Sequence, residues 1–219
     1  MLLNKQTIIG SVMQVVIAIL SMALLASCVA STANQKGFPH KSYVIDVVMN
    51  DFDSSDFKQV EANFISSKPK ALVFRVLSAI DTTPLWLDRL NKIEVVDVYS
   101  NQSYLLRTVI DSPWPFKDRE LISCVDTTFE KSVTTVKISS CSKRVTKSKD
   151  YVRIEKSESI WKLVDAKEGG TNISYKTWID PEGFVPAFLF NRELKKYTQA
   201  DLKRLSHLIE QSSLTKFSY

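Results

Sequence analysis

The chain has 219 residues, of which 44% are hydrophobic, and a formal net charge of +5 at pH 7. This length suits one domain with a sizeable core, and so small and dispersed a basic excess argues against a nucleic-acid-binding protein. Neither histidine, His40 or His207, belongs to a cluster with metal-ligand spacing, and none of the five glycines lies in a phosphate-binding loop. We therefore expect no metal, no cofactor and no nucleic-acid partner.

The first 27 residues have the layout of a secretory signal. Lys5 supplies the charged start, and residues 8–25 are almost all apolar. The stretch Leu25-Ala26-Ser27-Cys28 resembles the bacterial lipobox, in which the cysteine is diacylated and becomes the mature N-terminus. Two alternatives stay open: cleavage after Ala30 or Ala33, and retention of the apolar run as a transmembrane anchor.

The lipoprotein interpretation places the protein in the periplasm. Val29 follows the acylated cysteine and is not an Asp-type retention signal, so the expected destination is the outer membrane. The polar residues 28–41 would then form a tether, residues 42–212 the folded domain and residues 213–219 a tail.

Two further cysteines, Cys124 and Cys141, would lie in an oxidising compartment if the protein is exported. They fall on neighbouring predicted strands joined by a turn at residues 130–132. A simple hairpin that pairs Phe129 with Val133 places Cys124 opposite Ile138, so a disulfide would require a bulge or a shift in register. A bond between the two cysteines is possible, but the pattern does not require it.

The N-terminal part of the domain predicts two strands followed by two helices. Apolar residues alternate in the strands, and a serine followed by a proline is typical of a helix start. The expected elements are strands at Tyr43–Met49 and Phe57–Ile65, a turn at Asn50–Ser55, a helix at Pro69–Ile80 and a short helix from Thr83-Pro84.

The next ninety residues predict strands only. Every connection between these strands is short, so they should pair antiparallel as a meander. Arg107 and Arg153 fall within them and are either outward, solvated residues or polar contacts inside the fold. The six segments are Ile93–Tyr99, Tyr104–Ile110, Leu121–Phe129, Val133–Ser140, Tyr151–Leu163 and Asn172–Ile179.

The chain ends in a long amphipathic helix. A turn over Asp180–Gly183 precedes it, and Pro186 suits its first turn, because the backbone N–H that proline lacks would have no partner within the helix at that position. The apolar residues that follow recur at helical spacing for about 25 residues. Such a helix must bury its apolar stripe against the sheet. The fold class is therefore α+β, with a curved antiparallel sheet wrapped around the C-terminal helix.

Several stretches of the domain together resemble one family. Asp111-Ser112-Pro113-Trp114-Pro115-Phe116-Lys117-Asp118-Arg119-Glu120 looks like the "PWP…RD" stretch of steroidogenic acute regulatory protein-related lipid transfer (START) domains, especially bacterial envelope ones. Agreement extends to the helix after Pro69, the tryptophan of the penultimate strand, and Asp180–Gly183 with the helix that follows. The buried ion pair of cholesterol-binding members cannot be placed, because Leu106 and Val125 occupy the corresponding positions.

The resemblance implies a helix-grip fold with a closed apolar tunnel between the sheet and the C-terminal helix. It further implies that the tunnel is lined from the last two strands and the helix. The implied lining residues are Trp161, Leu163, Ile173, Tyr175, Thr177, Phe190, Leu194 and Tyr197.

The mouth of this tunnel is implied to lie where the Pro113–Lys117 loop meets the start of the helix. Its residues would be Trp114, Phe116, Arg119, Gly183 and Pro186. Arg119 could meet a lipid head group or belong to a structural ion pair that braces the loop. The two aromatic residues suit a membrane interface, or they anchor the loop by packing.

We expect a monomer that binds one lipid or other hydrophobic molecule and contacts a membrane surface. The sequence shows no nucleophile–base arrangement, so we expect no enzymatic activity. Two other functions remain open: an enzyme related to the helix-grip cyclases and hydratases, and an interaction module whose core is filled by side chains.

Overall fold

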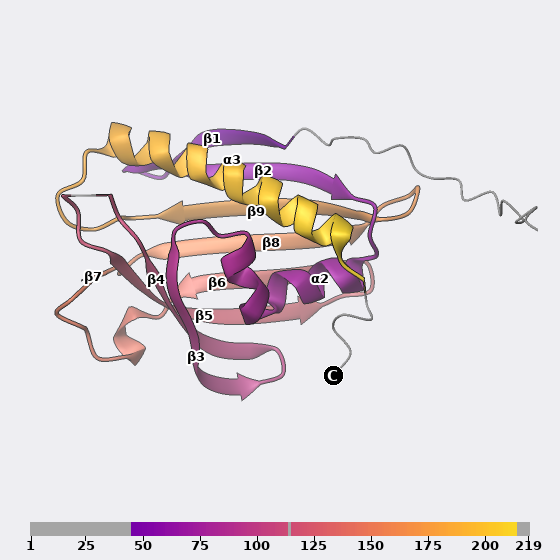
Figure 1. The fold of residues 1–219 in the computed structure, drawn as a ribbon, viewed down its shortest axis with the longest axis horizontal. Coiled ribbons are helices and arrows are strands. Elements are labelled where there is room, and N and C mark those ends of the chain that lie inside the picture. Colours follow the sequence, from indigo (N-terminus) through magenta and orange to yellow (C-terminus); the bar gives the residue numbers. More distant parts are fainter. Residues whose placement is uncertain (1–44, 114, 214–219) are drawn as a thin grey trace, which may run out of the picture. The chain divides into compact units, whose positions relative to one another are not determined.

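The computed structural model describes residues 45–113 and 115–213. Its element order confirms the predicted α+β fold class (Figure 1). The elements are β1 (Asp46–Phe52), β2 (Ser55–Ser66), α2 (Lys70–Ser78), the 3-10 helix η1 (Ile80–Leu85), β3 (Leu90–Ser100), β4 (Ser103–Ile110), β5 (Arg119–Phe129), β6 (Val133–Ser140), the 3-10 helix η2 (Ser142–Arg144), β7 (Val152–Arg153), β8 (Ser157–Asp165), β9 (Thr171–Ile179) and α3 (Ala187–Gln211).

All of the strands form a single curved sheet. Its order is β1-β2-β9-β8-β6-β5-β4-β3, with every neighbour on this path antiparallel, and the short β7 pairs in parallel with the start of β5. Short connections make β3 to β9 a meander, and β9, the last strand, pairs with β2 near the start of the domain. α3 and α2 both cover the same face of the sheet (Figure 1). We call this face the inner face.

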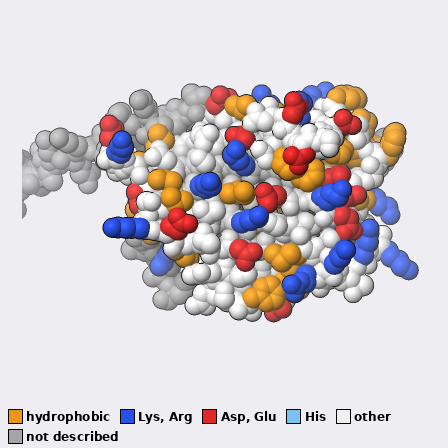
Figure 2. Space-filling model, turned by 180° about the vertical axis from the view of Figure 1, so that it is seen from behind, with side chains coloured by type: hydrophobic (Ala, Val, Ile, Leu, Met, Phe, Trp, Pro, Cys, Tyr) orange, Lys and Arg blue, Asp and Glu red, His pale blue; other side chains and the backbone are white. Residues whose placement is uncertain are grey.

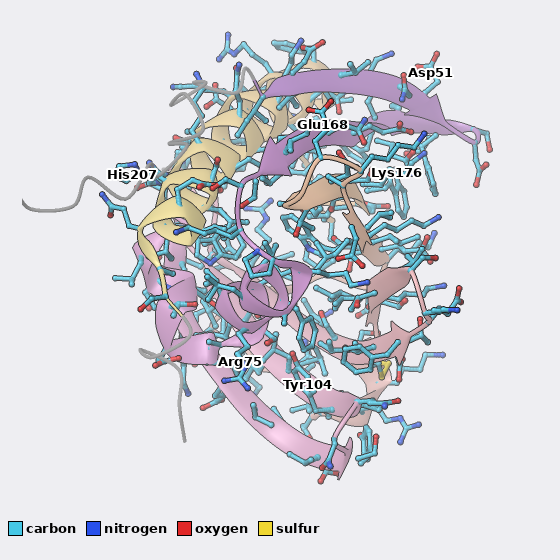
Figure 3. The ribbon with its side chains drawn as sticks, turned by 90° about the vertical axis from the view of Figure 1, so that its right-hand side faces the viewer. Asp51, Arg75, Tyr104, Glu168, Lys176 and His207 are labelled. Atoms are coloured by element: carbon cyan, nitrogen blue, oxygen red, sulfur yellow. A yellow bond between two sulfur atoms is a disulfide. The ribbon has the colours of Figure 1, made fainter. Side chains whose placement is uncertain are left out.

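The main core lies between the inner face and the two helices. Strand residues alternate strictly, so Val60, Ala62 and Phe64 of β2 are buried while the residues between them are more exposed. α3 contributes residues at helical spacing, Leu202, Leu205 and Ile209, each about 1% exposed. In the side view, the sheet curves around α3, and His207 lies on the side of the helix that faces away from the sheet (Figure 3).

A smaller core lies on the outer face. Leu105, Val109 and Ile122 are buried, although the alternation along β4 and β5 turns them away from α3. The segment from Cys141 to Thr146 folds over this region: the Cys141 N–H donates to the Ile122 carbonyl. Elsewhere, lysines, arginines and carboxylates are interspersed over the outer face (Figure 2).

Three details of the predicted strands were wrong. β1 continues to Phe52, so the first turn is tighter than Asn50–Ser55 and places Asp53 at φ 46°. The predicted strand Tyr151–Leu163 is two strands, because residues 152–153 pair with β5 whereas the chain from Ser157 pairs with β6 and β9.

The third error concerns the β5–β6 hairpin. Phe129 pairs with Thr134 rather than Val133, so Cys124 lies opposite Ser139. This shift by one residue brings Cys141 near Cys124, and the two form a disulfide with their Cα atoms 5.6 Å apart.

Several predictions concern residues outside the described part of the chain. These are the signal segment with Cys28, the tether, Trp114 of the mouth, and all but Ser213 of the tail. They stay predictions. In residues 45–113 and 115–213, no helix combines the length and the hydropathy that a membrane span requires.

Candidate functional site

One half of the inner face is packed closely against α2 and the C-terminal half of α3. The space that remains there is too small to admit a water molecule. Three of the residues predicted to line a tunnel, Trp161, Leu163 and Ile173, border this space. The complete lining is Phe64, Val73, Leu77, Trp161, Leu163, Ile173, Leu205 and Ile209.

The other half of the inner face is not sealed by the helix. Its strand residues lie on the inner face, as the strand registers show, yet keep partial solvent exposure. A closely packed core would leave such residues with almost none. This open half is defined by Thr108, Ile110, Leu121, Ser140, Ser159, Tyr175 and Ile179.

Tyr175 marks the boundary between the two halves. Its ring stacks on Trp161 with the centroids 4.1 Å apart. Burial raises the pKa of the Tyr175 hydroxyl, and hydrogen bonding with Thr177 and Ser159 offsets part of that effect. Tyr175 nonetheless keeps partial solvent exposure, although it lies on the inner face.

Hydroxyl groups are the polar groups of the open half. Ser159 Oγ and Thr177 Oγ1 are 2.7 Å apart, and both lie beside the Tyr175 hydroxyl. Thr177 is one of the predicted lining residues and is buried. These groups can donate or accept hydrogen bonds without carrying charge.

The helix side of the site comes from the first half of α3. Phe190 packs edge-on against Phe57, with the ring centroids 5.5 Å apart, and Leu194 packs against the core. Tyr197 instead contacts Arg89, whose guanidinium carbon lies 4.5 Å from the ring centroid. Of the three predicted lining residues on α3, Tyr197 is therefore the one in contact with a surface cation.

At the mouth, Arg119 joins the β4–β5 loop to the turn before α3. Its guanidinium donates to the carbonyl oxygens of Lys117 at 2.6 Å, Pro181 at 3.2 Å and Glu182 at 3.4 Å, and to the Ser112 hydroxyl at 3.2 Å. Burial lowers the pKa of Arg119, although Asp118 offsets part of the shift. The side chain thus braces the loop through backbone oxygens, whereas the sequence suggested an ion pair.

The turn that Arg119 holds has an unusual backbone. Glu182 has φ 54° and Gly183 has φ 72°, the left-handed region that a glycine enters freely and other residues rarely adopt. The Asp180 carboxylate accepts from the Glu182 N–H and stabilises the turn. Pro186 then caps α3, and its carbonyl accepts from the N–H groups of Leu189 and Phe190. Phe116 lies under the Arg119 guanidinium, 5.6 Å from it.

A buried charge network on the outer face was missed by the sequence analysis. The sequence left Arg153 as either a solvated residue or a polar contact in the interior. It is 2% exposed and donates to Glu120, which is 1% exposed, on the outer face of the sheet. Glu120 also accepts a hydrogen bond from Arg107. The Arg107 guanidinium in turn donates to the Glu94 carboxylate. The remaining guanidinium hydrogens of Arg153 bond to carbonyls of residues 142–146. The three consecutive charged residues 118–120 are evident in the sequence, but the pairing of Glu120 with Arg153, 33 residues later, is not.

Within residues 45–113 and 115–213, no three or more His, Cys, Asp or Glu side chains gather as a metal site would require.

The chain matches no protein-family model and no curated protein sequence. Solved structures do resemble it. A STAR-related lipid transfer protein from Xanthomonas axonopodis superposes with a TM-score of 0.70 at 19% identity, covering 77% of this chain and 94% of that one. Human STARD10 gives a TM-score of 0.70 at 15% identity, covering 80% and 72%. The ZhuI aromatase/cyclase from a Streptomyces species is more distant, with a TM-score of 0.52 at 13% identity and 70% and 93% coverage. The described domain has the helix-grip fold of STAR-related lipid transfer domains, as the sequence predicted.

Proposed function

We propose that this domain binds one lipid or other hydrophobic molecule between α3 and the open half of the inner face. The observation that carries the proposal is the partial exposure of inward-pointing residues such as Leu121, Tyr175 and Ile179. Apolar surface left partly exposed on the inner face favours an apolar occupant, at about 25 cal/mol per Å² buried. The fold supports the same function, since the Xanthomonas axonopodis protein that shares it is named for lipid transfer.

We further propose that the ligand is bound without chemical conversion. A helix-grip cyclase shares the fold, so fold alone does not separate binding from catalysis. The polar groups of the open half are the hydroxyls of Ser159, Tyr175 and Thr177, and the described residues there include no histidine that could serve as a general base.

Native mass spectrometry of the protein purified from its own cells tests both parts. We expect one bound lipid per chain, recovered intact after release. An unliganded protein that takes up no lipid from vesicles would instead favour a filled-core interaction module. Release of a hydrolysed or cyclised product would favour an enzyme.

We also propose that the protein is exported as a monomer and tethered through acylated Cys28 to the outer membrane. The disulfide between Cys124 and Cys141 supports maturation in an oxidising compartment. Replacing Cys28 by serine should abolish labelling by a fatty-acid probe and release the protein from the membrane fraction. Unchanged labelling of that variant would exclude acylation at this residue.

The membrane surface is the proposed partner. Phe184 and Phe188, beside the mouth, are 96% and 75% exposed. Phe188 shares one side of α3 with the exposed Arg192 and Lys195, at spacings of four and seven residues. Apolar rings next to cations suit a surface of anionic lipids.

A further inference from the structure

We infer that the ligand is a neutral amphiphile whose hydroxyl or carbonyl oxygen accepts a hydrogen bond from the Trp86 indole N–H. This inference rests on the proposed binding function and narrows its ligand class. It excludes an anionic head group, such as a phosphate or carboxylate, from the interior of the domain.

The first observation is an unsatisfied donor. Trp86 is 9% exposed, and its Nε1 is the one buried side-chain nitrogen or oxygen without a hydrogen-bond partner among the described residues. Buried polar groups nearly always have a partner, so an exception points to a group that the protein itself does not supply. A ligand oxygen would satisfy this donor.

The second observation is that Trp86 is held firmly in place. Its carbonyl accepts from Arg204 of α3 at 3.1 Å, and two residues later the Asp88 N–H donates to the Asp201 carboxylate at 3.2 Å. The end of η1 is thus fixed to the middle of α3. The indole ring meets Trp161 edge-on, with the centroids 6.4 Å apart.

Trp161 connects this donor to the open half of the inner face. Its ring contacts Trp86 on one side and stacks on Tyr175. An amphiphile that extends from the open half along this aromatic row would meet the Tyr175 hydroxyl first and the Trp86 N–H beyond it. Both positions offer hydrogen bonds to an uncharged oxygen.

The third observation concerns charge. The charged side chains near this row and at the mouth, Asp201, Arg204 and Arg119, are already engaged. Arg119 bonds to four oxygens of the mouth, and Asp201 is paired with Arg204 at 2.6 Å. A buried phosphate or carboxylate needs a cation or several donors to offset its lost hydration. Neutral donors, such as the Trp86 N–H and the hydroxyls of the open half, offset this cost less well than a cation does.

A series of three ligands of equal chain length tests the inference: dodecane, 1-dodecanol and dodecanoate. Each displaces an apolar fluorescent dye from the purified protein at a pH where dodecanoate is ionised. We expect dodecanol to bind about tenfold more tightly than either of the others, the effect of one buried hydrogen bond.

Trp86→Phe removes the donor and keeps most of the ring. It should reduce dodecanol affinity to near that of dodecane, while dodecane affinity stays the same. Trp178→Phe is the matched control, because the Trp178 indole N–H already bonds to the Phe57 carbonyl at 2.9 Å, and it should keep the preference for dodecanol.

Equal binding of all three ligands, or tighter binding of dodecanoate, would overturn the inference and leave the proposed binding function standing. Failure of the protein to bind any of them, or any lipid from vesicles, would overturn the binding function itself. Because the wild-type series decides between these outcomes, the test does not depend on folding of the Trp86 variant.

Discussion

Glu120 and Arg153 show how a single pair can determine the local structure. Both side chains are almost completely buried. A buried ion pair is stable only when nearly all of its hydrogen-bonding groups have partners. That requirement is met: Arg153 bonds to Glu120 and to three backbone carbonyls, and Glu120 also accepts from Arg107. The ion pair therefore fixes the 142–146 segment to β5.

We expect Arg153→Met to destabilise the domain by about 3–5 kcal/mol, because it leaves the Glu120 carboxylate buried without its main partner. The double variant Glu120→Leu with Arg153→Met should be less destabilised than the single variant. Chemical denaturation measures both. A loss below about 1 kcal/mol in the single variant would mean that Glu120 reaches water when Arg153 is absent.

Glu210, near the end of α3, is expected to make stability depend on pH. Burial alone would raise the pKa of its carboxyl, but hydrogen bonds from Ser67 and Ser66 outweigh that effect and lower the pKa. The folded pKa thus lies below the unfolded value of about 4.3. The ionised group stabilises the fold fully above the unfolded pKa, and this stabilisation is lost as pH falls through the folded pKa.

The measurement is the difference in unfolding free energy between wild type and Glu210→Gln across the acid range. It should be constant near neutral pH and shrink as the solution is acidified. Glu168→Gln, in an exposed turn, is the control. A Glu210 difference that does not change with pH would contradict the expectation.

At the scale of elements, the mouth consists of two segments that Arg119 connects. The β4–β5 loop and the 180–183 turn share its guanidinium, and the turn adopts positive φ at Glu182 and Gly183. Ligand entry beneath the start of α3 should require these segments to separate.

Replacing Arg119 by methionine removes its four hydrogen bonds and should speed ligand exchange by at least about tenfold, the kinetic effect of losing roughly one of them in net terms. Transfer of a fluorescent lipid between protein and vesicles measures the rate. Arg144→Met, an exposed arginine on the outer face, should exchange at the wild-type rate. If the Arg119 variant also does so, the gate lies elsewhere.

The sequence predicted the elements better than the contacts between distant residues. Alternation and helical spacing are local, so the meander and the long C-terminal helix could be deduced from them. The β5–β6 register depends on the length of the turn between the strands. A difference of one residue in that turn decides whether Cys124 lies near Cys141. The burial of Arg153 arises from a parallel pairing of two residues, which has no local pattern.

The candidate site was predicted only in part for the same reason. The family resemblance named Trp161, Tyr175 and Thr177, which lie together on β8 and β9. It did not predict that the Trp86 indole N–H lacks a hydrogen-bond partner, because the partners of an indole N–H depend on how η1 rests on α3. Equally, sequence could not show that two phenylalanines beside the mouth remain exposed.

At the scale of the whole molecule, apolar and basic residues surround the start of α3, where the proposed membrane contact would lie. Hydrophobic residues gather at one corner with lysines and arginines close to them (Figure 2). Phe184 is almost entirely exposed, in a turn that Arg119 holds against the β4–β5 loop. Insertion of this corner into a bilayer would place the mouth at the lipid surface.

Loading should therefore be faster from vesicles than from dispersed lipid. Opening the mouth exposes apolar surface, which is unfavourable in water and less so where Phe184 and Phe188 already lie among lipid chains. Replacing both by serine should slow loading from phosphatidylglycerol-containing vesicles about tenfold, given the apolar area lost. Loading from dispersed 1-dodecanol should be unchanged.

The control for this last experiment replaces exposed apolar residues away from the mouth. Val98 and Tyr99 of the edge strand β3 are 65% and 46% exposed, and serine at both positions should leave loading from vesicles unaffected. Added salt should slow loading of the wild type, because Arg192 and Lys195 then attract the anionic surface less strongly. If the two phenylalanine replacements slow loading from vesicles and from dispersed ligand equally, these residues act on the mouth itself and not on membrane contact.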